Sequence, residues 1–467
     1  MKHARGADKS RIPPGPRGNL LLGSLRRVQH EPLELLRQGF HEHGDIVRFR
    51  FGMTRAYLLA HPDHIAHVLH HNHRNYNKRN IDYAMLRRLL GNGLLTSDGA
   101  FWHRQRRLMA PMFHRQRIAG FCALMVSSTQ EMLERWDMMA VREEAFDVTA
   151  EMTRLTLAIV AKALFSADVS DDAEAIGAAL TEVNRQLGEF SLLDMFWMVP
   201  TRRKRRFREA VAALDAVVGK IIDARRRALH HNEDLLSMLL EAVDEETNET
   251  MTPRQVRDEV LTLLLAGHET TANALAWTWY LLALNPEAEQ KLHDEISGVL
   301  GGRPPVATDV PRLSYTRMVI EESMRLYPPA WAISRNAIGE DEIGGYRVQR
   351  GTNMIICSFI THRHPAIWEA SERFDPERFS PERSGGTAEF RISALRRGPA
   401  NLYRHGFAMT EAQLVLATVA QRYRLRLVPG HPVEPHPLIT LRPRHGIQMT
   451  LHRTDEADET LRQNAMR

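Results

Sequence analysis

Ala266-Gly-His-Glu-Thr-Thr271 lies in the middle of an apolar stretch that begins at Thr252-Pro253 and ends at Asn285-Pro286. Threonine is a favourable N-cap, proline suits the first turn of a helix, and a second proline stops a helix. We therefore predict one helix across this stretch, about 50 Å long at ~1.5 Å per residue. The adjacent threonines can bond back to helix carbonyls and the glycine permits close approach, so a buried groove is expected beside the motif.

The overall composition is that of an ordinary packed protein. The chain has 467 residues, of which 43% are hydrophobic and 25% are charged, and this balance disfavours disorder, collagen-like repeats and coiled-coil rods. Lys and Arg number 62 against 57 Asp and Glu, so the net charge of +5 is too small to indicate a nucleic-acid partner. Only Cys122 and Cys357 are present, which favours a reducing cytoplasm over a disulfide-rich compartment.

No part of the sequence predicts a membrane anchor. Residues 1–22 are polar and proline-rich, and they lack the apolar core of a signal peptide. The most apolar stretch, 261–284, contains His268, Glu269 and Asn273, which a bilayer would tolerate badly. We expect a cytoplasmic protein without a transmembrane segment, in which this stretch is a buried helix.

Helical periodicity dominates the rest of the chain. Apolar residues recur at three- and four-residue spacing in many segments, whereas alternation and turn residues mark only a few strands. We predict a mainly α fold with small β-sheets: a single domain at 23–453, a proline-rich N-terminal segment at 1–22 and a polar C-terminal tail at 454–467. The further helices are expected at 100–111, 115–140, 148–166, 172–190, 204–229, 286–300, 313–327 and 405–422. Strands are expected as an early β-hairpin at 46–51 and 56–60, a second hairpin at 343–352, and late strands at 423–428 and 439–451.

Five separated segments are similar to motifs of the cytochrome P450 superfamily, and the resemblance covers nearly the whole chain. The motif at 266–271 resembles the oxygen-activation motif of that family's long central helix. Because all five occur in the family's order and spacing, the chain is identified as a soluble, bacterial-type member with the cytochrome P450 fold. The other four are the ExxR-like Glu322-Ser-Met-Arg325, the PERF-containing Phe374-Asp-Pro-Glu-Arg-Phe379, the WxxxR-like Trp102-His-Arg-Gln-Arg106 and the proline-rich Pro13-Pro-Gly-Pro-Arg17.

The resemblance implies a charge network and a cofactor site. Glu322 and Arg325 lie at i,i+3 on one helix face, and Arg378 would add a second guanidinium to the pair. The members of this network must satisfy one another, because a lone buried charge is costly. In the family, haem iron is held by a cysteine thiolate in a loop of the form FGxGxRxCxG, just before a helix. The thiolate pushes electron density onto iron and favours O–O cleavage.

The ligand loop is the segment that departs most from the family. Trp102, Arg106 and Arg335 still match positions that contact the haem propionates. Residues 395–404, however, read Leu-Arg-Arg-Gly-Pro-Ala-Asn-Leu-Tyr-Arg, and Leu402 stands where the family has its ligand cysteine. Arginines also replace two of the loop's glycines, at positions where backbone would approach a macrocycle closely. The sequence therefore predicts a remodelled haem face.

From this loop we expect no metal and no cofactor, with haem b bound through Tyr403 or His405 as the alternative. A haem-free cavity under the central helix would leave Glu269, Thr270 and His268 to act on a substrate. A carboxyl group in apolar surroundings can serve as a proton donor or base. The sequence thus predicts a non-oxidative cyclase, isomerase or lyase of secondary metabolism, acting on a lipophilic, terpenoid-like substrate.

Three other functions stay open at this point. A ligand-less member of the family could be a binding partner that activates another biosynthetic enzyme, in which case surface residues would carry the function. The other two are a haem-binding monooxygenase with an atypical axial ligand and a decayed copy without function. The apolar segments 83–95 and 188–198 are expected to line the cavity, but they do not identify the substrate.

Overall fold

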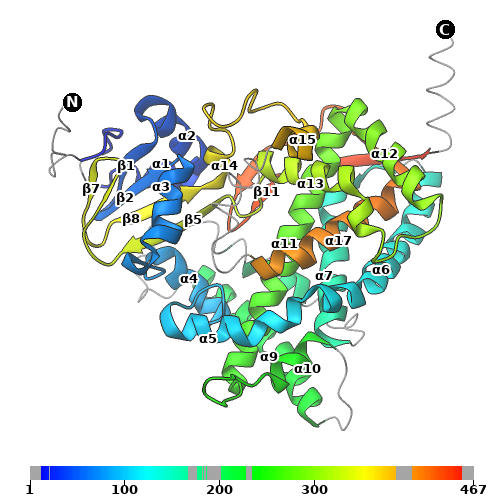
Figure 1. Cartoon of the computed structure of the whole chain (residues 1–467), viewed down its shortest axis with the longest axis horizontal. Coiled ribbons are helices and arrows are strands. Elements are labelled where there is room, and N and C mark those ends of the chain that lie inside the picture. The colour runs from blue at the N-terminus through cyan, green and yellow to red at the C-terminus, as the bar shows by residue number, and fades with distance from the viewer. Residues whose placement is uncertain are drawn as a thin grey trace.

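The computed structural model describes residues 12–19, 21–142, 144–166, 201–227, 234–384 and 402–454, with a few positions between 176 and 186; for residues 402–405 it describes the backbone alone. Helices make up most of this part, and the strands form small sheets (Figure 1). The predicted mainly α fold with small sheets is confirmed. Residues 1–11 and 455–467 lie outside the described part, so the predicted terminal segments stay predictions.

The long helices are arranged around α11 (Pro253–Leu284), which crosses the middle of the molecule (Figure 1). Most of the helices predicted from periodicity are present within a few residues of the expected bounds. The other principal helices are α1 (Leu25–His30), α2 (Pro32–His43), α3 (Pro62–Ala66), α4 (Ile81–Leu90), α5 (Gly99–Met109), α6 (Arg115–Val141), α7 (Val148–Phe165), α9 (Arg202–Arg227), α10 (Leu235–Glu241), α12 (Pro286–Leu300), α13 (Ser314–Leu326) and α17 (Leu402–Ala420).

The largest described sheet has five strands in the order β1-β2-β8-β5-β3. Its first two strands form the predicted antiparallel hairpin, and β2 then pairs in parallel with β8 from far along the chain. A three-stranded sheet, β4-β12-β9, and the pairs β6-β7 and β10-β11 complete the set. The strands are β1 (Ile46–Phe51), β2 (Thr54–Leu59), β3 (Tyr76–Asn77), β4 (Phe146–Asp147), β5 (Ala332–Ala337), β6 (Asp341–Ile343), β7 (Tyr346–Val348), β8 (Asn353–Cys357), β9 (Tyr423–Leu427), β10 (Pro435–Pro437), β11 (Leu441–Pro443) and β12 (Gln448–Arg453).

The start and end of α11 are where the sequence predicts them. Thr252 is the N-cap, and its hydroxyl accepts a hydrogen bond from the Gln255 amide (3.3 Å), while the Gln255 side chain accepts one from the Thr252 amide (2.7 Å). This reciprocal pair satisfies two backbone donors that a helix start leaves open. The helix ends at Leu284, two residues before Pro286.

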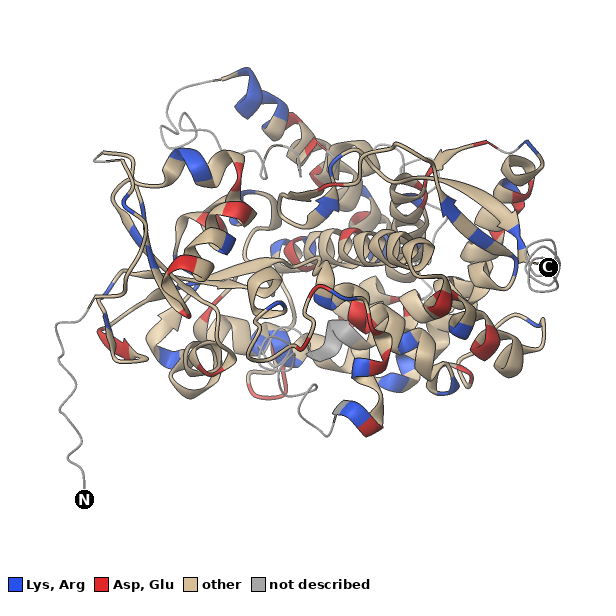
Figure 2. Cartoon of the chain, turned by 90° about the horizontal axis from the view of Figure 1, so that it is seen from above, with Lys and Arg blue, Asp and Glu red and all other residues tan. Residues whose placement is uncertain are grey.

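α11 is buried along most of its length because other helices cover it on several sides. It contacts α7, α13 and α17, and Gly267 allows the approach of α7, since a Cβ at that glycine would lie 3.0 Å from Cγ2 of Val160. Charged residues of both signs alternate over the outer elements (Figure 2). None of the described helices combines the length and apolarity needed to cross a membrane.

Two predicted elements differ from the structure. The range 439–451, predicted as one strand, is divided into β11 and β12. Pro443 cannot donate to a ladder, and Gly446 adopts a positive φ of 69°, so the chain turns between the two strands. The helix predicted at 172–190 falls mostly outside the described residues.

A buried ion-pair network ties α13 to the segment that follows it. Glu322 and Arg325 have fully buried side chains, and two hydrogen bonds of 2.7 and 2.8 Å join them. Arg378 Nε lies 3.3 Å from the same carboxylate. Arg325 also donates to the carbonyls of His362 (2.8 Å) and Ser371 (2.7 Å), so all three of its guanidinium nitrogens form hydrogen bonds. The predicted network is confirmed, and it joins segments that are distant in sequence.

Replacement of Arg325 by alanine should destabilise the protein strongly. The Glu322 carboxylate would stay buried without its main partner, a change that costs about 3–5 kcal/mol. Urea unfolding followed by circular dichroism measures this loss. Arg37→Ala is a matched control, because Arg37 pairs with Glu34 on the surface, with both side chains about half exposed, and should change the free energy of unfolding by less than about 1 kcal/mol. Equal effects of the two variants would contradict the assignment.

Candidate functional site

A cavity of about 2460 Å³ lies against the middle of α11. Ala266, Thr270 and Ala274 line it, and their spacing of four residues places them on one face of the helix. Because these side chains are small, a flat group can lie close to the helix backbone. Phe407 of α17 and Leu438, which follows β10, contribute apolar walls on other sides.

The sequence predicted part of this lining correctly. Tyr83, Leu86 and Leu95, from the segment 83–95, all line the cavity. The second segment expected to line it, 188–198, lies outside the described residues. A large apolar cavity with a few polar groups is the usual form of a site for a small lipophilic molecule.

The two threonines of the α11 motif bond back to the helix, as predicted. Thr270 Oγ1 donates to the carbonyl of Ala266 (2.7 Å), and Thr271 Oγ1 donates to that of Gly267 (2.9 Å). The hydroxyl hydrogen of Thr270 is therefore committed to the backbone. Its oxygen lone pairs remain available to a group in the cavity.

Glu269 is a buried carboxyl group held at the cavity wall. Thr440, just before β11, donates to Glu269 Oε1 (2.7 Å), and Asn273 Nδ2 donates to the Thr440 hydroxyl (3.0 Å). These contacts connect the middle of α11 with the C-terminal part of the chain. They fix the orientation of the carboxyl group, which lines the cavity together with Thr440.

His268 has different surroundings. Its Nδ1 lies 2.9 Å from the carbonyl oxygen of Leu264, and Thr156 of α7 donates to the backbone carbonyl of His268 (3.0 Å). Burial lowers the pKa of the imidazole, so it is neutral at physiological pH. Of the three predicted catalytic residues, Glu269 and Thr270 line the cavity, whereas His268 is not among the described residues that do.

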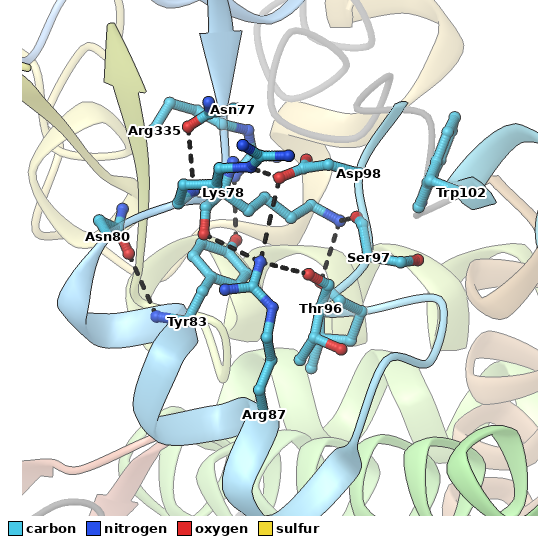
Figure 3. A network of polar contacts seen from close by, with 12 residues as sticks. Asn77, Lys78, Asn80, Tyr83, Arg87, Thr96, Ser97, Asp98, Trp102 and Arg335 are labelled. Atoms are coloured by element: carbon cyan, nitrogen blue, oxygen red, sulfur yellow. Dashed lines mark hydrogen bonds and ion pairs between the residues drawn. The ribbon is translucent and has the colours of Figure 1, made fainter. Parts of the chain in front are cut away.

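A buried lysine, Lys78, lies behind the cavity wall, where it contacts Leu95 and Tyr83, two residues that line the cavity. Figure 3 shows Lys78 and Tyr83. Lys78 is 6% exposed, and its Nζ donates to the carbonyls of Leu95 (2.9 Å) and Ser97 (3.0 Å). Burial, together with the nearby positive charge of Arg335, lowers the pKa of Lys78 to about 7. The charged ammonium is thus only marginally favourable here.

Two arginines complete a group that we call the cationic cluster, consisting of Lys78, Arg87 and Arg335. Arg87 donates to the carbonyl of Lys78 (3.1 Å), and its Nη2 is 4.0 Å from Asp98. Arg335 Nη1 donates to the hydroxyl of Tyr83 (2.9 Å), which lines the cavity. Because like charges repel one another and Lys78 is buried, this cluster would be stabilised by an anionic group entering from the cavity side.

Trp102 and Arg106 adjoin the same cluster. Trp102 Nε1 donates to the carbonyl of Leu94 (3.1 Å), and Arg106 Cζ lies 5.3 Å from the centre of the indole ring. Lys78 Nζ lies 5.8 Å from that ring, between Trp102 and Arg335 (Figure 3). The structure therefore brings together the three residues that the sequence assigned to propionate contacts.

Sequence reasoning missed Lys78, Arg87 and Thr440. Lys78 is followed by Arg79 and precedes the helix cap Asn80, and such basic pairs are usually solvated. Thr440 lies in a segment predicted as a continuous strand. No local pattern could have placed either residue at a cavity, because their partners are far away in sequence.

The described residues fit a flat, apolar cofactor that carries carboxylates. The small face of α11 would lie against the body of such a group, and the cationic cluster would compensate its acid groups. Haem has this chemistry. The residues proposed as its axial ligand or as replacements, Leu402, Tyr403 and His405, have side chains outside the described part, so nothing tests them.

The described residues offer no evident substitute for an axial thiolate. Cys122 of α6 lines the cavity, but its Sγ donates to the carbonyl of Ile118, and burial raises the pKa of the thiol to about 11. Burial likewise raises the pKa of Cys357 to about 12. Both are expected to stay protonated. No group of three or more His, Cys, Asp or Glu side chains in the described part is arranged to hold a metal ion.

Comparison with known proteins gives a consistent result. The sequence model of the Cytochrome P450 family matches residues 13–451. The "Cyclooctatin synthase" of Streptomyces melanosporofaciens is 37% identical over 430 residues, which cover 91% of this chain and 92% of that protein. The "Cyclooctat-9-en-7-ol 5-monooxygenase" of the same organism is 35% identical, with 88% of each chain covered. The "Pentalenene oxygenase" of Streptomyces avermitilis is 32% identical, with 90% and 93% covered.

These matches correct one prediction from the sequence. The expectation of no cofactor, with haem b disfavoured, was wrong: the matching family and these relatives are haem-dependent monooxygenases, so haem is the expected cofactor. The prediction gave the altered loop at 395–404 more weight than the remaining site. The cavity, with the cationic cluster adjoining its lining residues Tyr83 and Leu95, is by contrast compatible with haem in size and charge.

Replacement of Lys78 by methionine should alter how stability depends on pH. The folded pKa of about 7 lies below the ordinary value of 10.5, so between these values the unfolded chain binds more protons and the free energy of unfolding rises with pH. Lys78→Met removes this rise, which is at most about 1.4 kcal/mol per pH unit. Urea unfolding from pH 7 to 10 measures it.

The control for this experiment is Lys291→Met. Lys291 pairs with Glu377 at the surface, and that hydrogen bond raises rather than lowers the pKa of the amine. Removing Lys291 should therefore leave the rise in stability over this range in place. An unchanged pH dependence in the Lys78 variant would contradict a buried amine of lowered pKa.

Proposed function

Because this chain belongs to the cytochrome P450 family, we propose that it is a haem-dependent monooxygenase of a lipophilic, terpenoid-like substrate. The observation that carries the proposal is the cavity of about 2460 Å³ on the small face of α11, with the cationic cluster beside it. It is large enough for a cofactor and a substrate together. The names of the relatives, which include a cyclooctatin synthase and a pentalenene oxygenase, support the terpenoid class.

The residues that would hold haem are already defined by the site. Ala266 and Ala274 leave space for its flat body. Lys78 and Arg335 adjoin the lining residues Leu95 and Tyr83, from where they would compensate its carboxylates. When bound, haem supplies dioxygen activation: one oxygen atom enters a substrate C–H bond and the other leaves as water, with two electrons from an external reductant and two protons.

The chain's own contribution to this reaction is the handling of protons and the exclusion of water. Glu269 can hold a proton at Oε2 while Oε1 accepts from Thr440 (2.7 Å). Thr270 presents an oxygen acceptor beside it, since its hydrogen is donated to Ala266. Apolar walls such as Phe407 and Leu438 keep the substrate end of the cavity dry. Glu269 is thus the proposed proton source and Thr270 the acceptor that orients water.

A non-oxidative cyclisation or isomerisation, and a role as activator of another enzyme, stay predictions from the sequence. The first requires Glu269 or His268 to reach the substrate directly. Oε1 of Glu269 is engaged by Thr440, and Nδ1 of His268 is 2.9 Å from the carbonyl oxygen of Leu264, so neither contact favours this reaction over oxygenation.

The substrate class can be tested by binding alone. We expect diterpene and sesquiterpene alcohols to bind in equilibrium dialysis, and sugars and amino acids not to bind. Ala266→Phe places a ring in the cavity and should weaken terpenoid binding at least about tenfold. Ala224→Phe on the exposed side of α9 is the control and should leave binding unchanged. Absence of terpenoid binding, or equal binding by both variants, would contradict the substrate class.

Glu269→Gln should reduce product formation without changing substrate affinity. The amide keeps the size and the hydrogen bond to Thr440 but cannot supply a proton, and loss of a general acid typically costs about a hundredfold or more in rate. The measurement is the oxygenated terpenoid formed from labelled dioxygen by haem-loaded protein. The control is Glu287→Gln in the exposed first turn of α12. A Glu269 variant of normal activity would rule out the proton role.

A further inference from the structure

The site and the ligand loop disagree with each other. The described residues fit haem, yet Leu402 stands at the ligand position and carries no donor atom. The mismatch with the family is confined to the loop. The motif Phe374–Phe379 before the loop and the segment Phe407–Ala412 after it match the family, whereas residues 395–404 match at one motif position, Gly398. Residues 385–401 lie outside the described part of the chain, and only their sequence bears on the loop.

We propose that residues 395–405 are encoded by the family's ligand loop read one nucleotide out of frame. The genetic code fixes two bases of most codons from the amino acid. In a reading that starts at the second base of each codon, the first base of every new codon is therefore dictated by this chain. The third base is also dictated, except before leucine or arginine, where it is limited to two choices, and the middle base varies among the synonymous codons. Such a shifted reading can contain a given motif only if those dictated bases agree with it.

The shifted reading agrees with FGxGxRxCxG at all six specified positions. It allows phenylalanine at position 395, glycine at 396, 398 and 404, arginine at 400 and cysteine at 402. One complete loop that it allows is Phe-Gly-Gly-Gly-Pro-Arg-Ile-Cys-Ile-Gly, in which the four positions that the motif leaves open could also carry other residues. The register needs no adjustment, because the cysteine falls on the position that the flanking motifs had already assigned to the ligand.

The remaining reading frame provides an internal control. Read from the third base of each codon, the codon at position 402 must end in T-A and the one at 395 in C-G or A-G, so neither cysteine nor phenylalanine is allowed. Phenylalanine and cysteine both require T as the first base and a pyrimidine as the third, which an unrelated segment rarely supplies. Agreement at all six positions in one frame, and failure in the other, is not expected by chance.

The described site keeps positive charges that suit an anionic cofactor, whereas the loop sequence no longer matches the family. Lys78 and Arg335 remain together beside the cavity, although burial already lowers the pKa of Lys78 to about 7. A chain that had lost its anionic cofactor long ago would have no reason to keep Lys78 buried beside a second positive charge. One nucleotide gained before codon 395 and one lost near codon 406 leave the length unchanged, so α17 continues in register at Phe407.

This inference rests on the proposed function, since it assigns the iron ligand that a haem-dependent oxygenase needs. Its first test is the gene. Sequencing should find, at each motif position, one of the one or two synonymous codons that give the motif in the shifted frame. Any codon other than CTG or TTG at residue 402 would overturn the proposal. The expected codons are CTT for Leu395, CGG for Arg396, GGG for Gly398, GCG for Ala400, CTG or TTG for Leu402 and CGG or AGG for Arg404.

The second test is made on the protein. A chain carrying the shifted-frame loop at 395–405 should bind haem stoichiometrically in the pyridine haemochrome assay and show the carbon monoxide difference band of thiolate-ligated haem. The same chain with leucine kept at position 402 is the control and should lack that band. A folded restored chain, judged by circular dichroism, without the band would overturn the proposal.

The two proposals fail in different ways. If the restored chain shows thiolate-ligated haem but no terpenoid binds, the reading-frame inference stands and the substrate class is wrong. If terpenoids bind but the codons differ from those expected, the substrate class stands and the inference is wrong.

Discussion

The buried carboxylate of Glu322 is the group on which the arrangement of the molecule depends. It is paired with Arg325 and approached by Arg378, and Arg325 in turn donates to backbone carbonyls of the segment after α14 (Ser358–Thr361). A buried charge network tolerates only the geometry that satisfies every member. It therefore fixes α13 against the chain that leads to α17, and both helices contact α11.

Once these helices are fixed, the position of the site follows. α11 presents Ala266, Thr270 and Ala274 to the cavity, while Gly267 faces α7 and lets that helix approach. Thr440 comes from the opposite end of the chain and holds Glu269. The site is thus built where a small-residue helix face meets a polar contact between distant segments.

The sequence correctly predicted the contacts that form between residues close together in the chain. The Thr252–Gln255 cap, the backward hydrogen bonds of Thr270 and the Glu322–Arg325 pair all join residues within one or two helical turns, so their spacing is informative. The burial of Lys78 and the contact of Thr440 with Glu269 depend on tertiary packing across many residues, and no local pattern records them.

The same limit explains the wrong cofactor prediction. It relied on one short loop read by itself, although the positive charges that an anion would compensate come from α4, β5 and the segment before α4. A single altered segment is weak evidence against a function when the surrounding site keeps its chemistry. The cavity and the cationic cluster carry more information about the cofactor than Leu402 does.

The amine of Lys78 has a further consequence for cofactor loading. Because its pKa is about 7, the empty site exists as a mixture of neutral and positively charged forms near neutrality. A carboxylate arriving beside it would favour the charged form, so haem entry would draw a proton from solution. Assembly of the holoprotein is then thermodynamically linked to acidity, and alkaline conditions would weaken it.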